Sequence, residues 1–223
     1  MAEVMLRRGR RRQRDQRERI AAAARQYAAM GWPVCPGAHL RQPGAGGTGR
    51  ACSCDRVGCP APGAHPVSPV WQQQASTDAA AVGRWWLTAP DASLILVTGR
   101  VFDVLDVPAA VGLAAIGMML RSGSRPGPVA ASAGERTLFF VATRGVPATE
   151  DEWWSCHLDC IPDNPAQTSG LRWHCRNSYV LAPPSRHGRG LMASWILDPA
   201  DHPLPDPVRL LEFLADASAE ADR

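Results

Sequence analysis

The sequence predicts an α+β or mixed α/β domain in which helices flank a mixed β-sheet. Hydrophobic residues make up 45% and charged residues 20% of the 223 residues, which is typical of a globular chain long enough to bury a core. Segments rich in helix-forming residues alternate with short apolar segments that end at Gly or Pro. Helices interleaved with hairpins in this way indicate an α+β or mixed α/β fold.

Each predicted helix has a start or stop signal in the sequence. Gly31 ends a segment of Gln, Arg, Glu and Ala residues, the tripeptide Ser-Thr-Asp at 76–78 is a favourable helix start, and Pro108 suits a first helical turn. We predict helices at residues 13–30, 76–87, 108–121 and 207–217.

The predicted strands are short apolar segments bounded by turn residues. Gly99 separates two of them, and Gly134 lies in the turn of a hairpin. We predict strands at residues 32–35, 93–98, 100–107, 129–132, 136–142, 171–175, 179–182 and 195–197. Residues 37–69 are rich in Gly and Pro and lack periodicity, so we expect a long loop that needs more than a hydrophobic core to order it.

Positive charge is concentrated at the N-terminus. All 24 basic residues are Arg, and the abundance of Ala, Gly, Pro and Arg suggests a high-GC bacterial genome. Residues 1–31 hold nine Arg against three acids, a net charge of +6, whereas the remaining 15 Arg are set against 18 acids. We divide the chain into a disordered basic arm (1–12), one domain (13–217) and a tail (218–223).

The basic arm is a candidate nucleic-acid contact, because guanidinium groups are suited to phosphate. Its central candidates are Arg10, Arg11 and Arg12. A solvated tail, or an arm that binds RNA or docks a protein partner, fits the same composition.

No segment of the sequence is suited to a membrane. The longest apolar runs are broken by Gly, Arg or Asp before they reach the length of a transmembrane helix. The apolar run after the basic start, residues 20–24, is too short for a secretory signal. We therefore expect a cytoplasmic protein, in which the seven Cys are free or bind metal rather than form disulfides.

The sharpest local pattern is Cys52-x-Cys54-x4-Cys59-x5-His65. Three thiolates and an imidazole are the ligand set of a closed structural zinc site, and small or turn-forming residues between them let the chain wrap an ion. Zinc would also order the long loop that contains these residues. Free loop thiols beside an unrelated His are the alternative, and His39 or Cys35 could replace a ligand.

A second group of candidate ligands comprises Cys156, His157, Cys160, His174 and Cys175. His174 and Cys175 are adjacent on a predicted strand, so their side chains should point to opposite faces of it. This weakens the case for a second metal site.

Several segments now occur in an order that resembles a known family. They are residues 28–34, 52–66, 71–78, 84–90, 94–107, 138–140 and 179–187. The most specific are the Cys-rich loop that ends in His-Pro, the Trp-Trp pair at 85–86, and the segment Tyr-Val-Leu-Ala-Pro-Pro-Ser at 179–185. Over residues 20–198 the chain resembles the bifunctional DNA primase/polymerase (prim-pol) domain of the archaeo-eukaryotic primase superfamily, in an actinobacterial form with a zinc loop.

The resemblance implies a mixed sheet and two-metal nucleotidyl transfer. Family members hold two divalent ions with two carboxylates on one strand face and a third on a later strand, while a His on an intervening strand contacts phosphate. Here Asp106 occupies the first carboxylate position, and Pro108 stands where the second belongs. The His position is Thr137, and the third carboxylate position is Arg172. Asp103 should point to the opposite face from Asp106.

These departures lead to three hypotheses. The first is a catalytically degenerate prim-pol domain, a pseudoenzyme that binds nucleic acid or nucleotide. The second is an active primase/polymerase of DNA replication, with Mg²⁺ or Mn²⁺ held by rearranged ligands, such as Asp106 with Glu135, or with Asp103 after a bulge. The third is a regulatory module that binds a protein partner. Under the first hypothesis a basic pocket would bind phosphate, and its candidate residues are Arg136, Arg172, Arg176, Arg186 and His187. Ordinary solvated strand ends are the alternative for these Arg.

Overall fold

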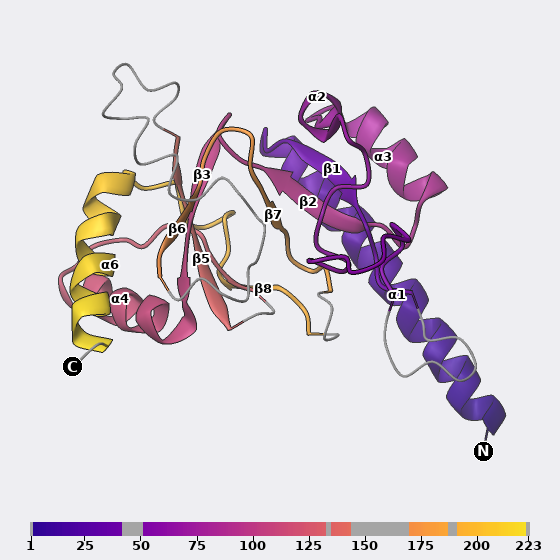
Figure 1. The fold of residues 1–223 in the computed structure, drawn as a ribbon, viewed down its shortest axis with the longest axis horizontal. Coiled ribbons are helices and arrows are strands. Elements are labelled where there is room, and N and C mark those ends of the chain that lie inside the picture. The colour runs from indigo at the N-terminus through magenta and orange to yellow at the C-terminus, as the bar shows by residue number, and fades with distance from the viewer. Residues whose placement is uncertain (1, 42–50, 133–134, 144–169, 187–190, 222–223) are drawn as a thin grey trace.

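The computed structural model describes residues 2–41, 51–132, 135–143, 170–186 and 191–221 and has an α+β fold with two β-sheets (Figure 1). The smaller sheet has the order β1-β2-β7, with strands β1 (Val34–Gly37), β2 (Ser93–Val97) and β7 (Tyr179–Leu181). The larger sheet has the order β6-β3-β5-β4-β8, with strands β3 (Phe102–Pro108), β4 (Val129–Ser132), β5 (Arg136–Ala142), β6 (Arg172–His174) and β8 (Ser194–Leu197). The α+β class is confirmed. The expectation of one mixed sheet is wrong for the described strands, whose pairings are all antiparallel.

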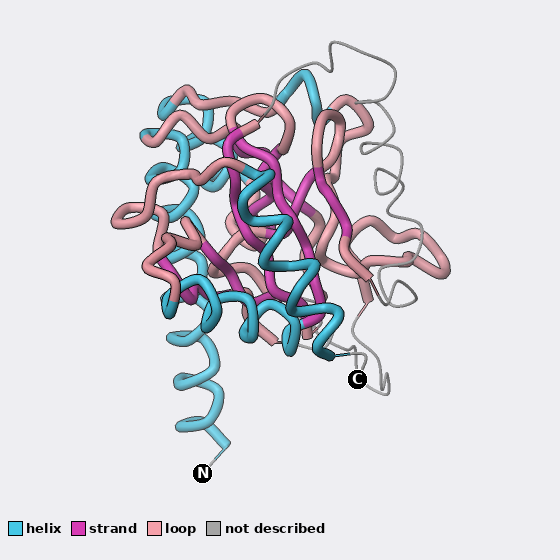
Figure 2. The backbone as a smooth tube through the Cα atoms, turned by 90° about the vertical axis from the view of Figure 1, so that its left-hand side faces the viewer, coloured by secondary structure: helices cyan, strands magenta, loops and turns pink. Residues whose placement is uncertain are grey.

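The helices are divided between the two sheets (Figures 1 and 2). The helices near the smaller sheet are α1 (Ala2–Ala29), α2 (Trp71–Gln74) and α3 (Ala79–Thr88), and those beside the larger sheet are α4 (Ala109–Arg121) and α6 (Pro207–Ala221). Asp78 caps α3, because its carboxylate accepts a hydrogen bond from the amide of Ala81 at 2.6 Å. Pro108 precedes α4 as its N-cap residue and ends β3.

Helix α1 corrects the expected N-terminal boundary. It begins at Ala2 rather than near Gln13, so residues 2–12 are helical and not a disordered arm. Arg and Ala are strong helix formers, which explains why the helix continues into the basic segment. At the other end of the chain, α6 continues to Ala221, into the expected tail.

The larger sheet has a hydrophobic core on each face. On one face, Val104, Leu138 and Phe140 pack in the same cluster as Trp32 and residues of α1. The Trp32 and Phe140 rings stack with centroids 5.3 Å apart. On the other face, Leu105 and Val107, with Phe139, join residues of α4 and α6. Strand β3 is therefore buried on both faces, which explains its nearly continuous apolar sequence.

Two turns carry the chain between the sheets and pack against each other. One joins β2 to β3 through Gly99, and the other joins β6 to β7 through Arg176. The Thr98 hydroxyl donates to the carbonyl of Cys175 at 2.6 Å, and the Thr98 amide donates to the carbonyl of Ser178 at 3.0 Å. Gly99 has φ +79°, and a Cβ there would lie 2.2 Å from the Cα of Arg176, so this close approach requires glycine.

Candidate functional site

The two acids of β3 lie on opposite faces of the sheet. Asp106 lies on the same face of β3 as Val104, which belongs to the core beside α1. Asp103 lies on the same face as Leu105, which packs toward α4 and α6. Both carboxylates are buried, with relative exposures of 4% for Asp103 and 6% for Asp106. The two side chains therefore cannot hold the same metal ion. This supports the expectation from strand parity.

An arginine neutralises Asp106. The Nε of Arg136, on the neighbouring strand β5, donates to Asp106 Oδ1 at 2.6 Å, and the Arg136 Nη2 donates to the Asp106 carbonyl at 2.8 Å. The same Nη2 donates to the carbonyl of Gly170 at 2.8 Å. Both side chains are largely buried, with 12% and 9% of their surfaces exposed. This geometry fixes the guanidinium against the carboxylate that would otherwise face a cation.

A histidine approaches the other oxygen of Asp106. His174 Nε2 lies 3.4 Å from Asp106 Oδ2, and His174 Nδ1 lies 3.0 Å from the hydroxyl of Ser178. These three residue types also form hydrolase triads. Here Ser178 is buried, with 7% of its surface exposed, and the ion pair with Arg136 already occupies Asp106. The chain of contacts is therefore suited to holding Asp106 in place rather than to activating Ser178.

The two other family positions also lie near β3. Arg172 is buried and pairs with Asp106 across β6 and β3, which places a second guanidinium on the face of Asp106. Thr137 pairs with Val107 and packs against α4, where a Cβ on Gly112 would lie 2.4 Å from the Thr137 Cβ. Thr137 therefore faces away from Asp106. Strands β3, β5 and β6 contain no carboxylates besides Asp103 and Asp106.

Asp103 lies in an environment that disfavours its charged form. Its Oδ2 accepts a hydrogen bond from the Trp173 indole at 3.2 Å, and its buried Oδ1 has no partner within the described residues. Burial raises the pKa of Asp103 to about 6, although the hydrogen bond from Trp173 acts in the opposite direction. A carboxyl group in this setting is a weak ligand for a dication.

The Cys-rich loop brings its four candidate ligands together. One ligand atom each from Cys52, Cys54, Cys59 and His65 can be chosen so that all lie within 4.8 Å of one another. A tetrahedral zinc ion with Zn–S distances of about 2.3 Å requires this kind of spacing. Cys52 Sγ and His65 Nε2 are 3.3 Å apart. The donor set therefore fits a closed metal site.

Backbone contacts orient the imidazole for this role. His65 Nδ1 lies 2.8 Å from the carbonyl of Pro66, which fixes Nδ1 as the protonated nitrogen and leaves Nε2 for the cluster. The amide of Gly63 donates to Cys52 Sγ at 3.4 Å. This contact helps to hold the Cys52 sulfur in place within the cluster.

Two thiols of the cluster, those of Cys54 and Cys59, differ in acidity. The backbone at Arg56 lowers the pKa of Cys54 to about 7, whereas burial raises the pKa of Cys59 to about 11. Metal binding requires both as thiolates, so loading the cluster releases protons, more from Cys59 than from Cys54.

The candidate arginines do not form one pocket. Arg136 and Arg172 lie near the end of β3 that leads into α4, whereas Arg176 lies in the turn beside Gly99, at the opposite end. These ends are about 20 Å apart for a strand of this length. Arg186 is exposed, and its carbonyl lies near Gly63 of the Cys-rich loop. The expected four-arginine pocket is thus wrong.

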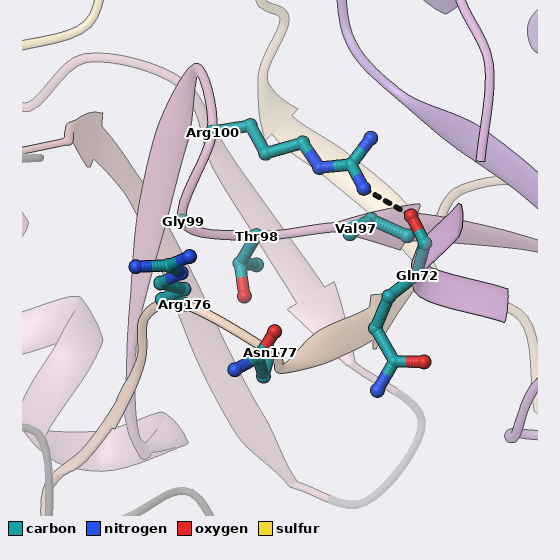
Figure 3. A pocket seen from close by; sticks show the side chains of 7 residues that line it. All are labelled: Gln72, Val97, Thr98, Gly99, Arg100, Arg176 and Asn177. Carbon is teal, nitrogen blue, oxygen red and sulfur yellow. Dashed lines mark hydrogen bonds between the residues drawn. The ribbon is translucent and has the colours of Figure 1, made fainter. Parts of the chain in front are cut away.

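Arg176 instead lines a cavity that the sequence did not indicate. The cavity has a volume of about 310 Å³ and lies where the two crossing turns meet (Figure 3). Arg100 and Asn177 also line it. Arg100 follows Gly99 in the turn, but a Gly-Arg pair alone in a sequence does not indicate a binding site. Asn177 has φ +63°, a conformation that Asn tolerates better than most residues.

The remaining candidates are partly described. Arg10, Arg11 and Arg12 are exposed on α1. His187, Cys156, His157 and Cys160 lie outside the described residues. Of the second ligand group, His174 contacts Asp106, and Cys175 is buried in the core beside α4 and α6. Those two side chains point apart, as strand parity predicts.

The fold and these sites define an α+β domain with an acidic position on an interior strand of its larger sheet and a Cys/His cluster in a loop. A model of the family described as "Bifunctional DNA primase/polymerase, N-terminal" matches residues 24–207. The chain belongs to this family, and the resemblance noted from its motifs is confirmed. A search of curated proteins found no match. In the described part of the chain, no helix combines the length and the apolar character needed to cross a membrane.

Proposed function

We propose that this protein is a catalytically degenerate prim-pol domain that binds nucleic acid or nucleotide. Family membership supports a primase/polymerase-like function. The observation that carries the proposed degeneracy is the ion pair of Asp106 with Arg136, at 2.6 Å, on the strand whose other acid faces the opposite way.

The physical argument concerns charge. Two-metal nucleotidyl transfer requires several anionic ligands around two dications about 3.5–4 Å apart. Asp106 is ion-paired with Arg136 and lies across from Arg172 on β6, and Pro108 offers no ligand where the family has a carboxylate. A dication placed there would meet positive charge. The residues on β3, β5 and β6 therefore do not fit a catalytic Mg²⁺ or Mn²⁺ ion, and we assign them no step in nucleotidyl transfer.

A second group of positive charges, on helix α1, favours an anionic ligand. Helix α1 extends beyond the sheets at its N-terminal end (Figure 1), and the described Arg side chains on that part of the helix are exposed. Arg10, Arg11 and Arg12 lie on this part of the helix. A row of guanidiniums attracts phosphate and releases counterions from nucleic acid. In the proposed function, α1 contributes sequence-independent affinity.

The Cys-rich loop has a structural part in this proposal. Cys52, Cys54, Cys59 and His65 would hold one zinc ion, which would tie the long loop to β1. The loop already pairs with that strand through Gly37 and Pro66. Four protein ligands leave no open position, so the ion would stabilise the fold rather than take part in chemistry.

Equilibrium binding tests the proposal. Fluorescence anisotropy would compare a labelled single strand, a duplex and a nucleoside triphosphate, each with and without added Mg²⁺. We expect at least one of them to bind, with an affinity that does not require Mg²⁺, since Asp106 is already neutralised. Binding that depends on Mg²⁺ would contradict the assigned degeneracy. Failure of all three ligands to bind would favour the protein-interaction hypothesis.

A further inference from the structure

The cavity between the two crossing turns lies away from the Asp106 position. Its lining includes Thr98, Gly99 and Arg100 from the turn between β2 and β3, and Arg176 and Asn177 from the turn between β6 and β7 (Figure 3). Gln72 of α2 closes a third side. At about 310 Å³, the cavity is at the small end of the range for ligand pockets, roughly 300–1,000 Å³.

The lining combines polar and apolar surface and carries positive charge. Arg100 and Arg176 contribute two guanidiniums, and none of the described residues that line the cavity is acidic. Arg100 extends toward α2, where its Nη2 donates to the carbonyl of Gln72 (Figure 3). A guanidinium has five donor hydrogens, so one such contact leaves donors for an anion. The nearby acid of β3, Asp103, is buried and accepts from Trp173.

The backbone of the cavity is held in place before any ligand arrives. Two hydrogen bonds from Thr98, to the carbonyls of Cys175 and Ser178, lock one turn to the other. Gly99 lies directly against Arg176, with no room for a side chain. A pocket whose walls are already fixed loses less entropy when it binds a ligand.

We propose that this cavity binds a phosphate group through Arg100 and Arg176. Planar guanidiniums recognise phosphate oxygens through paired hydrogen bonds, and the Asn177 amide adds a further donor. The phosphate belongs either to a free nucleotide or to the backbone of a nucleic-acid strand. This inference rests on the proposed binding of nucleic acid or nucleotide, and it adds a location, at the other end of β3 from Asp106.

Charge-removing substitutions test the site. Arg100→Gln and Arg176→Gln keep polar side chains of intermediate length, and Arg209→Gln on the exposed surface of α6 is the matched control. Affinities for inorganic triphosphate, a nucleoside triphosphate and a single-stranded oligonucleotide would be measured for each variant, alongside thermal unfolding. We expect each pocket variant to bind at least one of these ligands about tenfold more weakly, or weaker still, whereas Arg209→Gln should change none of the affinities.

The arms of the experiment distinguish the two sources of phosphate. Suppose that only the affinity for the oligonucleotide falls, and that the slope of log affinity against log salt concentration becomes shallower by about 0.7 per lost contact. This result assigns the pocket to the backbone of a nucleic-acid strand. Loss of triphosphate affinity assigns it to a nucleotide. Wild-type affinity in both folded pocket variants would overturn the site and leave the proposed function standing. Failure of the wild-type protein to bind any of the ligands would overturn both.

Discussion

At the scale of single residues, the proposed degeneracy rests on the pairing of Asp106 with Arg136. The pair is largely buried and is supported by the carbonyls of Asp106 and Gly170. In such a pair, removal of one partner leaves the other as an uncompensated buried charge. In the proposed function, the role of Asp106 is therefore conformational.

The two members of this pair should differ in their effect on stability. Arg136→Met leaves the buried Asp106 charge without its ion-pair partner and should lower the free energy of unfolding by about 3 kcal/mol. Asp106→Asn leaves Arg136 with two carbonyl acceptors and should cost only about 1 kcal/mol. Urea unfolding at neutral pH measures both. The double variant should be more stable than the sum of the single effects predicts, and simple additivity would contradict the buried pairing.

Asp103 should make stability depend on pH. Its pKa of about 6 in the folded state lies above the value of about 3.9 for an exposed Asp, so the folded protein binds this proton more tightly than the unfolded chain. The contribution of Asp103 to stability is then greatest below pH 4, decreases as the pH rises through about 6, and is constant above that.

Asp103→Asn removes this titration. At pH 8 the variant should be about 1–2 kcal/mol more stable than the wild type, and the advantage should shrink toward pH 4. Chemical unfolding at several pH values gives the difference curve between the two proteins. A difference curve that does not change with pH would show that Asp103 titrates normally.

The sequence allowed some of these residue-scale features to be predicted and not others. The opposite orientations of Asp103 and Asp106 follow from the two-residue period of a strand, which is local information. The Cys/His cluster could be predicted because its ligands lie within one short segment. The contact of Asp106 with Arg136 joins residues 30 positions apart and depends on the register of β3 and β5, which no local pattern specifies.

At the scale of elements, helix α1 combines two roles along its length. Its C-terminal half is buried against the core through Ala24 and Tyr27. In its middle, Gln16 donates to the carbonyl of Pro184 at 2.6 Å, and Arg17 pairs with Asp91 at 2.6 Å. Toward the N-terminus, the described side chains from residue 7 to residue 14 are exposed.

This division determines how nucleic-acid binding by α1 should be tested. Deleting residues 7–19 would also remove the contacts of Gln16 and Arg17, so substitution is the cleaner change. A triple variant with Arg10→Gln, Arg11→Gln and Arg12→Gln should bind single-stranded nucleic acid more weakly. The slope of log affinity against log salt concentration should become shallower by about 0.7 per lost phosphate contact. The melting temperature should stay within about 2 °C of the wild type. An unchanged salt slope would assign this part of α1 to another role.

The Cys-rich loop is the element that depends most on a ligand. Protein purified without added zinc should contain one zinc ion per chain, because four suitable donors converge in the loop. Cys54→Ser combined with Cys59→Ser should lose the zinc and the stability of the loop, measured by metal analysis and limited proteolysis. The control Cys35→Ala, a buried thiol outside the cluster, should retain the ion. Unchanged zinc content in the double variant would contradict the site.

The elements themselves were predicted with uneven success. Strands β4 and β5 were predicted with their observed bounds, because Gly and Pro punctuate the sequence on either side of the hairpin. The short helix α2 was missed, since four residues give no helical periodicity. Strand β1 begins at Val34 rather than Trp32, because the Trp32 amide still donates to the carbonyl of Tyr27 at the end of α1 and Pro33 has no amide hydrogen.

At the scale of the whole molecule, the fold separates two candidate sites along one strand. The C-terminal end of β3 carries Asp106 and its guanidinium partners, and the N-terminal end leads into the turn that forms the cavity. The division into two antiparallel sheets could not be predicted, because β2 with β7, and β3 with β6, pair across long stretches of sequence. The α+β class could be predicted, because it depends only on the alternation of elements.

The central claim is that this member of the prim-pol family has lost nucleotidyl transfer while it keeps a fold suited to phosphate. Template-dependent primer extension by the full chain, with deoxynucleotides and either Mg²⁺ or Mn²⁺, tests it most directly. We predict that the wild-type protein gives no product above background with either metal, and that Asp106→Asn behaves identically, because Arg136 already neutralises that carboxylate. Robust metal-dependent extension by the wild-type protein that is lost in Asp106→Asn would contradict the account and assign Asp106 to catalysis.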